Sequence, residues 1–94
     1  MIDTKQILYS YPEINPLPVI ASFSGKGGVK PIYFQKNEKI IQVSVRKIEK
    51  GGLYRSFKCE YMIEDDNRVH TIELIFIPDL DIWGIPKNTT VHPI

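Results

Sequence analysis

The sequence predicts an all-β fold, a small SH3-like antiparallel barrel or roll of about five to six strands, with a short irregular or helical N-terminal lead. From Val19 onward, short runs of β-branched and aromatic residues are separated by clusters of Gly, Asn and Asp, as in small all-β proteins. Several runs alternate apolar with polar residues, which is typical of half-buried strands. The length of 94 residues corresponds to one domain with a single modest core.

Residues 1–18 are predicted to form the lead. Asp3 or Thr4 can act as the N-cap of one or two helical turns. Three prolines then interrupt any helix, because proline lacks the backbone N–H and clashes with the preceding turn (Pro12, Pro16 and Pro18). We therefore expect a lead over residues 1–18, one β domain over residues 19–85 and a C-terminal tail over residues 86–94.

The first half of the domain is predicted to contain three strands. Residues 19–24 and 32–35 are short runs rich in β-branched and aromatic side chains, with a glycine-rich loop between them. The loop KNEK, residues 36–39, leads to a third strand over residues 40–48. Apolar and polar residues alternate over residues 41–46 of this third strand, so one of its faces is expected to be buried.

The second half is predicted to form a long hairpin and a short last element. The Gly-Gly turn at residues 51–52 leads into a strand over residues 53–63, and the loop EDDNR turns the chain back. The partner strand covers residues 69–77, and residues 80–83 form the last element. An OB-type barrel usually carries a helix where this chain has only the Gly-Gly turn, which favours the SH3-like alternative.

Alternating positions of neighbouring strands project to one face, so the pattern also predicts a core. Ile75 is expected on the opposite, outward face, and Val91 and Ile94 are the only apolar anchors of the tail. The predicted members of the core are Val43, Val45, Phe57, Cys59, Tyr61, Ile72, Leu74 and Phe76.

The segment KPIYFQKNEKIIQVSVRKI starts at Lys30 and continues into the long hairpin that ends near Trp83. It resembles small uncharacterised bacterial all-β domains, in which a Lys-Pro-x-x-Phe strand is followed by a polar turn and an alternating strand. The similarity covers Pro31 to Trp83, although this chain lacks the tryptophan that those domains carry at the first hairpin. The resemblance implies the fold and no activity.

The string SGKGGV, which starts at Ser24, resembles the opening of the phosphate-binding loop of the MinD and ParA ATPases. Such a loop needs a glycine before the second lysine, a Ser or Thr after it, and a helix that follows. Lys30 is preceded by Val29 instead of glycine and followed by Pro31 instead of Ser or Thr, and Pro31 leads into a β-rich segment. We therefore expect a hairpin-like loop that binds no nucleotide.

No constellation of residues predicts catalysis, a metal or a cofactor. His70 and His92 lack the spacing of paired metal ligands and are expected to be solvated. The acidic run at residues 64–66 lacks the calcium-loop pattern and is interpreted as a polar turn. Cys59 alternates with core residues, where a thiolate is disfavoured. The chain is therefore predicted not to be an enzyme.

Composition limits the partners. The net charge of +1 provides no overall attraction to nucleic acid or to an anionic membrane. No apolar run reaches the roughly 20 residues that a membrane span needs, and the N-terminus does not look like a signal peptide. The single cysteine excludes an internal disulfide framework. These features indicate a cytoplasmic protein with no membrane partner.

Charge is nevertheless distributed unevenly along the chain. Residues 26–58 contain nine basic and two acidic residues, whereas residues 60–81 contain seven acidic residues and one basic residue. One interpretation is cross-strand pairing, for example of Lys58 with Glu73. The other is a basic face with Tyr33 or Tyr54 as a stacking platform for nucleic acid. The candidate partner-binding residues are Lys26, Lys30, Tyr33, Lys36, Lys39, Arg46 and Lys47.

The function that these features favour is a small cytoplasmic binding module for a protein or for a second copy of the chain, through an exposed strand edge. A nucleic-acid-binding accessory domain that uses the basic residues 26–58 is the alternative. A scaffold subunit of an enzyme is a third class that the sequence leaves open.

Overall fold

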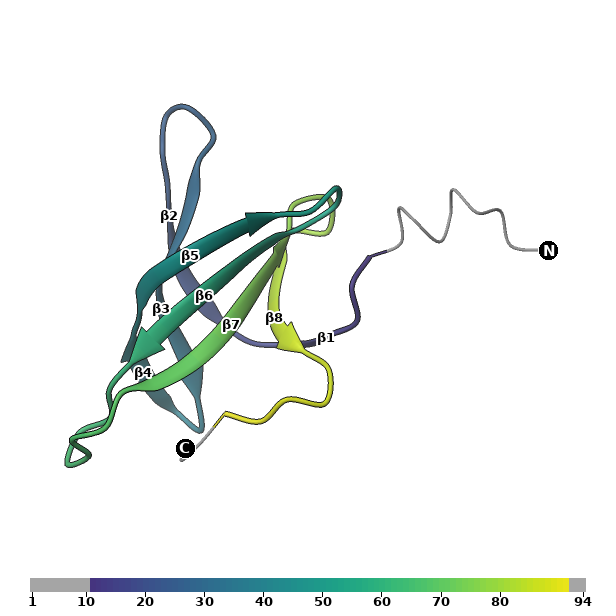
Figure 1. Ribbon diagram of the computed structural model, residues 1–94. Coiled ribbons are helices and arrows are strands. Elements are labelled where there is room, and N and C mark those ends of the chain that lie inside the picture. Colours follow the sequence, from purple (N-terminus) through teal and green to yellow (C-terminus); the bar gives the residue numbers. More distant parts are fainter. Residues whose placement is uncertain (1–10, 92–94) are drawn as a thin grey trace.

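The computed structural model describes residues 11–91, and this range contains strands but no helix (Figure 1). The predicted all-β class is therefore confirmed. Eight strands form two antiparallel sheets, which is more than the number predicted, and the sheets do not close into a barrel. The helical turns expected after Thr4 lie outside the described residues.

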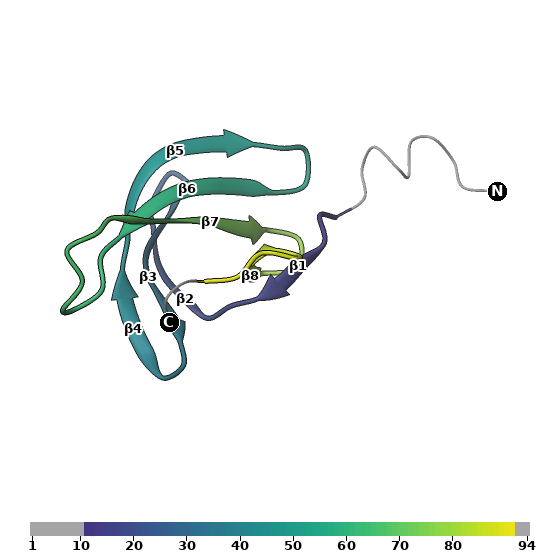
Figure 2. The same ribbon diagram turned by 60° about the horizontal axis from the view of Figure 1, so that its bottom comes forward.

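The two sheets face each other across a shared core (Figure 2). All neighbouring strands are antiparallel. The five-stranded sheet has the order β1 (Ile14–Pro16), β8 (Ile82–Pro86), β7 (His70–Ile77), β6 (Arg55–Tyr61) and β5 (Ser44–Lys50). The three-stranded sheet has the order β2 (Val19–Phe23), β3 (Val29–Lys36) and β4 (Lys39–Gln42).

The predicted strand over residues 40–48 is divided between the two sheets. β4 ends at Gln42 and β5 begins at Ser44, with Val43 at the bend. The Val43 N–H donates to the carbonyl of Ile32 on β3, 2.9 Å away, and the Val43 side chain stays in the core. Because the apolar alternation continues through the bend, it does not reveal that the chain changes sheets.

The predicted boundary between lead and domain is wrong, because residues 14–18 belong to the domain. β1 pairs with β8, and Leu17 is a buried member of the core. The Leu17 N–H donates to the Trp83 carbonyl at 3.0 Å, and the Gln35 N–H donates to the Pro18 carbonyl at 2.9 Å, so this bend touches both sheets. The prolines exclude a helix, but an edge strand tolerates them because one side of it carries no ladder hydrogen bonds.

The predicted core is confirmed. Of its eight residues, seven are buried members of one apolar cluster, and Val45 is partly buried and packs against that cluster. The structure adds Phe34 from the three-stranded sheet, whose ring meets that of Tyr61 edge-on with centroids 5.2 Å apart. Val91 is also buried in the cluster, as expected for an anchor of the tail, whereas Ile94 lies outside the described residues.

Ile75, which the alternation places on the outward face, is nevertheless buried, with 5% of its surface exposed. Its register partner on β8 is Gly84, and β1 lies directly against this glycine. A Cβ atom on Gly84 would lie 2.5 Å from the Asn15 carbonyl oxygen and 2.7 Å from Ile14 Cδ1. The missing side chain therefore lets β1 cover this part of the outward face.

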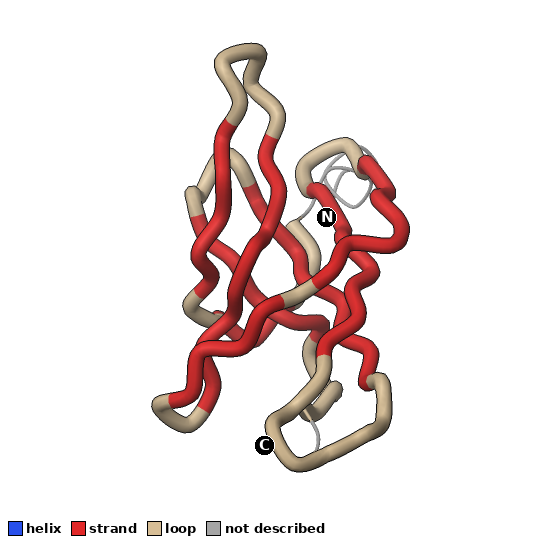
Figure 3. Tube along the Cα trace, turned by 90° about the vertical axis from the view of Figure 1, so that its left-hand side faces the viewer, coloured by secondary structure: helices blue, strands red, loops and turns tan. Residues whose placement is uncertain are grey.

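The hairpin of β2 and β3 extends beyond the rest of the fold, at the top of Figures 1 and 3. We call its residues 21–30 the arm. The register shifts between Ile20 and Ala21, because Ile32 on β3 has no partner there, and such a bulge bends a strand. Phe23 on the arm is 64% exposed, and its ring lies against Phe76 of β7 with centroids 6.2 Å apart.

Candidate functional site

The glycine-rich loop at residues 24–28 is a closed hairpin turn built around Ser24. The Ser24 N–H donates to the Gly28 carbonyl at 2.8 Å, and the Gly27 N–H donates to the Ser24 carbonyl at 3.1 Å. The Ser24 hydroxyl accepts from the N–H groups of Gly28 at 2.8 Å and Lys26 at 3.3 Å. A phosphate loop instead directs its N–H groups at the ligand and continues into a helix. Here those groups bond to Ser24, and strand β3 follows.

The KNEK segment is a two-residue turn rather than a four-residue loop. Asn37 and Glu38 are its central residues, with φ values of 50° and 67°. Lys36 and Lys39 are register partners at the ends of β3 and β4. Positive φ at both central positions is the geometry that fits the twist of a hairpin. The two lysines therefore project from neighbouring strands at a fixed place.

The seven predicted partner-binding residues do not form one face. Figure 1 shows the arm and the turn between β3 and β4 at opposite ends of the molecule. β5 belongs to the other sheet. Lys26 and Lys30 lie on the arm, Lys36 and Lys39 at the other end of β3, Tyr33 in the middle of β3, and Arg46 and Lys47 on β5.

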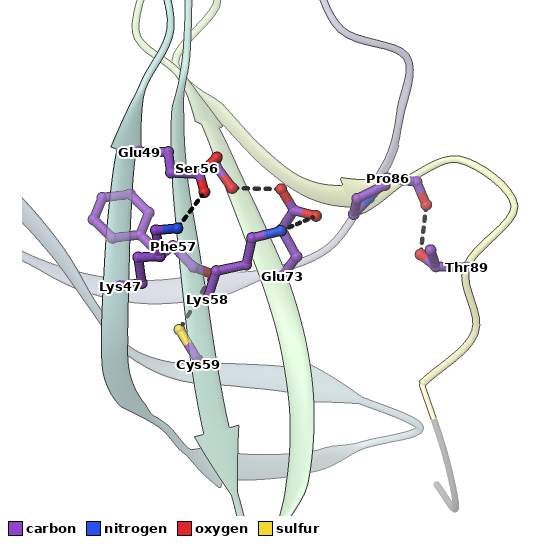
Figure 4. A network of polar contacts seen from close by, with 9 residues as sticks. All are labelled: Lys47, Glu49, Ser56, Phe57, Lys58, Cys59, Glu73, Pro86 and Thr89. Carbon is purple, nitrogen blue, oxygen red and sulfur yellow. Dashed lines mark hydrogen bonds and ion pairs between the residues drawn. The ribbon is translucent and has the colours of Figure 1, made fainter.

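The expected cross-strand pair of Lys58 and Glu73 is present in the structure. They are register partners on β6 and β7, with Nζ 3.2 Å from Oε1 (Figure 4). Ser56, which is 1% exposed, donates its hydroxyl to the other oxygen of the Glu73 carboxylate. One carboxylate therefore satisfies both a surface cation and a buried hydroxyl.

Arg46 and Lys47 also lie beside carboxylates. Arg46 Nε is 2.5 Å from Glu60 Oε1 on the neighbouring strand. Lys47 Nζ is 3.2 Å from Glu49 Oε1 on the same strand, as Figure 4 shows. A register shift between Val45 and Lys47 accompanies these pairs. Among residues 11–91, the lysines at 26, 30, 36 and 39 form no ion pair. The predicted basic face is thus divided in space and partly neutralised.

A groove of about 470 Å³ lies beside the first half of β7. β7 pairs with β8 only from Ile75 to Ile77, so residues 70–74 have β6 on one side and no strand of the described range on the other. The opposite wall is the segment that follows β8. The groove is lined by Lys58, Thr71, Glu73, Pro86, Thr89 and Val91, among others.

The sequence does not predict this groove directly. It contains one indirect signal: the strand predicted over residues 69–77 is longer than the element predicted over residues 80–83, so part of the longer strand would have no partner. β8 is longer than that element, but after Gly84 its remaining residues pair with β1 instead of β7. The difference in length therefore locates the free edge only when it is known that the first half of β8 pairs with β7 and the second half with β1.

His70 is not a solvated histidine as expected. Its ring stacks on Tyr61 with centroids 5.3 Å apart, and its Nε2 lies 2.9 Å from Asp66 Oδ2. Asp66 also accepts the Arg68 N–H at 2.8 Å. The backbone N–H of Arg68 and the His70 ring lower the pKa of Asp66 to about 2. The acidic run therefore closes the loop between β6 and β7, as a polar turn does.

The described residues offer little for catalysis or metal binding. Burial raises the pKa of Cys59 to about 11, so its thiolate is strongly disfavoured. Within residues 11–91, no group of three His, Cys, Asp or Glu side chains is placed to hold a metal ion. The same range contains no helix long and apolar enough to cross a membrane.

No protein-family model, curated protein or solved structure matches the chain. The resemblance of the strand at Lys30 to small bacterial β domains therefore stays a prediction.

Proposed function

We propose that this chain is a protein-binding module that takes up an extended segment of a partner along the free edge of β7. The observation that carries the proposal is the pairing of β7. Its residues 70–74 extend beyond the β8 pairing, and residues 71–73 border the 470 Å³ groove. Alternate residues of an antiparallel strand direct their N–H and C=O groups to each side, so such an edge offers main-chain partners to an added strand.

The walls of the groove favour a segment of low net charge. Lys58 and Glu73 line it as a pair, and so do Arg46 and Glu60. Because each cation faces a carboxylate, the groove attracts neither strongly anionic nor strongly cationic chains. Apolar residues of the interior, including Val91, contribute to the lining, so a partner side chain can be buried there.

The remaining parts of the interpretation belong to the same proposal. β1 and β2, and likewise β4 and β5, are successive strands that bend from one sheet into the other, which supports a relationship to small SH3-like barrels. A reducing cytoplasm suits the single, buried Cys59. A non-catalytic role agrees with the inert thiol.

The experiment is selection from a random-peptide phage library, followed by affinity measurements with the synthesised peptides. Thr71 is exposed on β7, so Thr71→Trp fills the groove without changing the core. Ser22→Trp is the matched control, since Ser22 is an exposed residue of β2 in the other sheet. We expect Thr71→Trp to lower peptide affinity about tenfold or more, equivalent to about 1.4 kcal/mol, and Ser22→Trp to leave it unchanged.

Amide chemical-shift mapping gives a second readout. Peptide binding should shift the resonances of residues 70–74 and of Thr89 more than those of β2. A library that yields no enriched peptide, or peptides whose affinity is insensitive to Thr71→Trp, would reject the proposal.

A further inference from the structure

A second surface, separate from the β7 groove, combines cations with aromatic rings. Lys50, Arg55, Phe76 and Trp83 are successive register partners across β5, β6, β7 and β8. Directly opposed residues of antiparallel strands share one face, so these four side chains form a single row. We call it the cross-strand row. Phe76 belongs to the core cluster, which places the row on the face toward the three-stranded sheet.

The aromatic half of the row continues onto the arm. The rings of Phe76 and Trp83 have centroids 4.9 Å apart, and the Phe23 ring of the arm meets Phe76 at 69°. Phe76 is buried and Trp83 half-buried, whereas Phe23 is 64% exposed. An aromatic ring that is fixed on one side and exposed on the other is available to a flat partner.

The cations around these rings are not neutralised. Lys50 and Arg55 form no ion pair with any residue in the range 11–91, and the same holds for Lys26 and Lys30 on the arm. This contrasts with Lys58, whose partner Glu73 lies 3.2 Å away. Lys30 is the register partner of Ser22, whereas Phe23 is the partner of Val29, so the Lys30 side chain lies on the face of the arm opposite Phe23. Three unpaired cations, Lys26, Lys50 and Arg55, thus accompany one exposed and one half-buried aromatic ring.

Acidic residues limit the surface on one side. Asp79 and Asp81 lie in the turn between β7 and β8, next to the Trp83 end of the row. They repel an anionic ligand there, so its path is restricted to the Lys50 end and the arm. Figure 1 shows the turn between β5 and β6 at the same end of the sheet as the turn between β7 and β8.

We propose that the cross-strand row and the arm bind single-stranded nucleic acid, with a base stacked on Phe23 and phosphates beside Lys50, Arg55 and Lys26. Exposed rings among unpaired cations are the two components that sequence-independent single-strand binding requires. A purely apolar protein partner would leave the three cations unmatched. The proposal retains Lys26 from the sequence prediction and replaces Tyr33, which is half-buried in the middle of β3, with Phe23.

The test uses a fluorescently labelled oligothymidylate of about twelve nucleotides. Its anisotropy is measured with increasing protein at low and at moderate salt, together with the fluorescence of Trp83, the single tryptophan of the chain. We expect binding that quenches Trp83 and weakens as salt increases. Phe23→Ala should lower the affinity about fivefold or more. Phe23→Tyr should retain it, and Phe23→Leu should not, because leucine keeps the apolar contact but cannot stack.

The matched control for charge is a pair of unpaired lysines far from the row. Lys50→Gln with Arg55→Gln should weaken binding and reduce the slope of log affinity against log salt by about 1.4, the value for two contacts to a single strand. Lys36→Gln with Lys39→Gln, at the opposite end of β3, should change neither.

Four results would overturn the proposal. They are no binding at low salt, an equal effect of the two double variants, full affinity of Phe23→Leu, or equally tight, Phe23-dependent binding of a polyglutamate peptide. The last would assign the surface to an acidic peptide. Because Thr71→Trp leaves this surface intact, the two proposals can fail independently.

Discussion

Ser56 on β6 donates its buried hydroxyl to the carboxylate of Glu73 on β7. Lys58 shares the same carboxylate from the surface, with its Nζ 3.2 Å from Oε1. Part of the charge asymmetry along the sequence is therefore neutralised by an ion pair between the basic and the acidic segment. Glu73 is the structurally more important partner, because its loss affects both a surface ion pair and a buried polar group.

The two sides of this network should differ in stability. Lys58→Ala removes an exposed ion pair and should cost less than about 1 kcal/mol. Glu73→Ala leaves the Ser56 hydroxyl without its acceptor and should cost about 1 to 3 kcal/mol. Urea unfolding of both variants measures the difference. Equal losses would show that the bond to Ser56 contributes nothing.

Phe57 tests the core. It is 1% exposed and contacts Trp83 with ring centroids 5.5 Å apart. Phe57→Ala should lower the free energy of unfolding by about 3 to 5 kcal/mol, because it creates a cavity between the sheets. Phe23→Ala is the control on an exposed ring and should cost far less. A loss below about 1 kcal/mol for Phe57→Ala in chemical unfolding would mean that the register is wrong.

Gly84 tests the position of β1. A methyl group there would meet the Asn15 carbonyl oxygen at 2.5 Å, and backbone cannot yield as a flexible side chain can. Gly84→Ala should therefore destabilise the fold by about 1 to 3 kcal/mol. Hydrogen exchange should show the faster opening first at the amides of β1 and β8. Unchanged stability would indicate that β1 does not pair where the structure places it.

A substitution in the turn between β3 and β4 should increase the free energy of unfolding. Glu38 has a φ of 67°, a conformation that costs a residue with a side chain about 1 to 2 kcal/mol. Glu38→Gly removes this cost, but glycine loses more chain entropy on folding, so the net stabilisation should be about 0.5 to 1 kcal/mol. Thermal and urea unfolding would show it. A destabilised variant would contradict the assigned turn geometry.

Asp66 should make stability depend on acid. Its pKa in the folded protein is lowered to about 2, chiefly by the Arg68 N–H and then by His70, compared with about 3.9 for an unperturbed aspartate. A lowered pKa stabilises the fold above about pH 4, and this contribution is lost as the pH falls toward 2. Asp66→Asn should be less stable near neutral pH and should lose less stability between pH 4 and 2. Parallel pH profiles of the two proteins would contradict this role.

Strand content and core membership were predictable because both depend on local patterns. In β6 and the first half of β7 the apolar side chains recur at every second residue, and a strand with that period has only one face to bury. Phe57, Leu74 and their neighbours could therefore be placed without knowing which strands are adjacent. The pairing of Lys58 with Glu73 followed from the same hairpin, since the two strands are consecutive along the chain.

The sequence by itself determined an all-β chain with one core, because those features follow from the period of apolar residues within each strand. Only the tertiary structure decided where the sheets bend, that β1 belongs to the domain, that β7 keeps a free edge and that Lys50, Arg55, Phe76 and Trp83 align. Each of these depends on contacts between distant segments, such as Ile14 with Pro86. A three-residue strand that ends in proline has too short a pattern to indicate its partner, so its place is set by what packs against it.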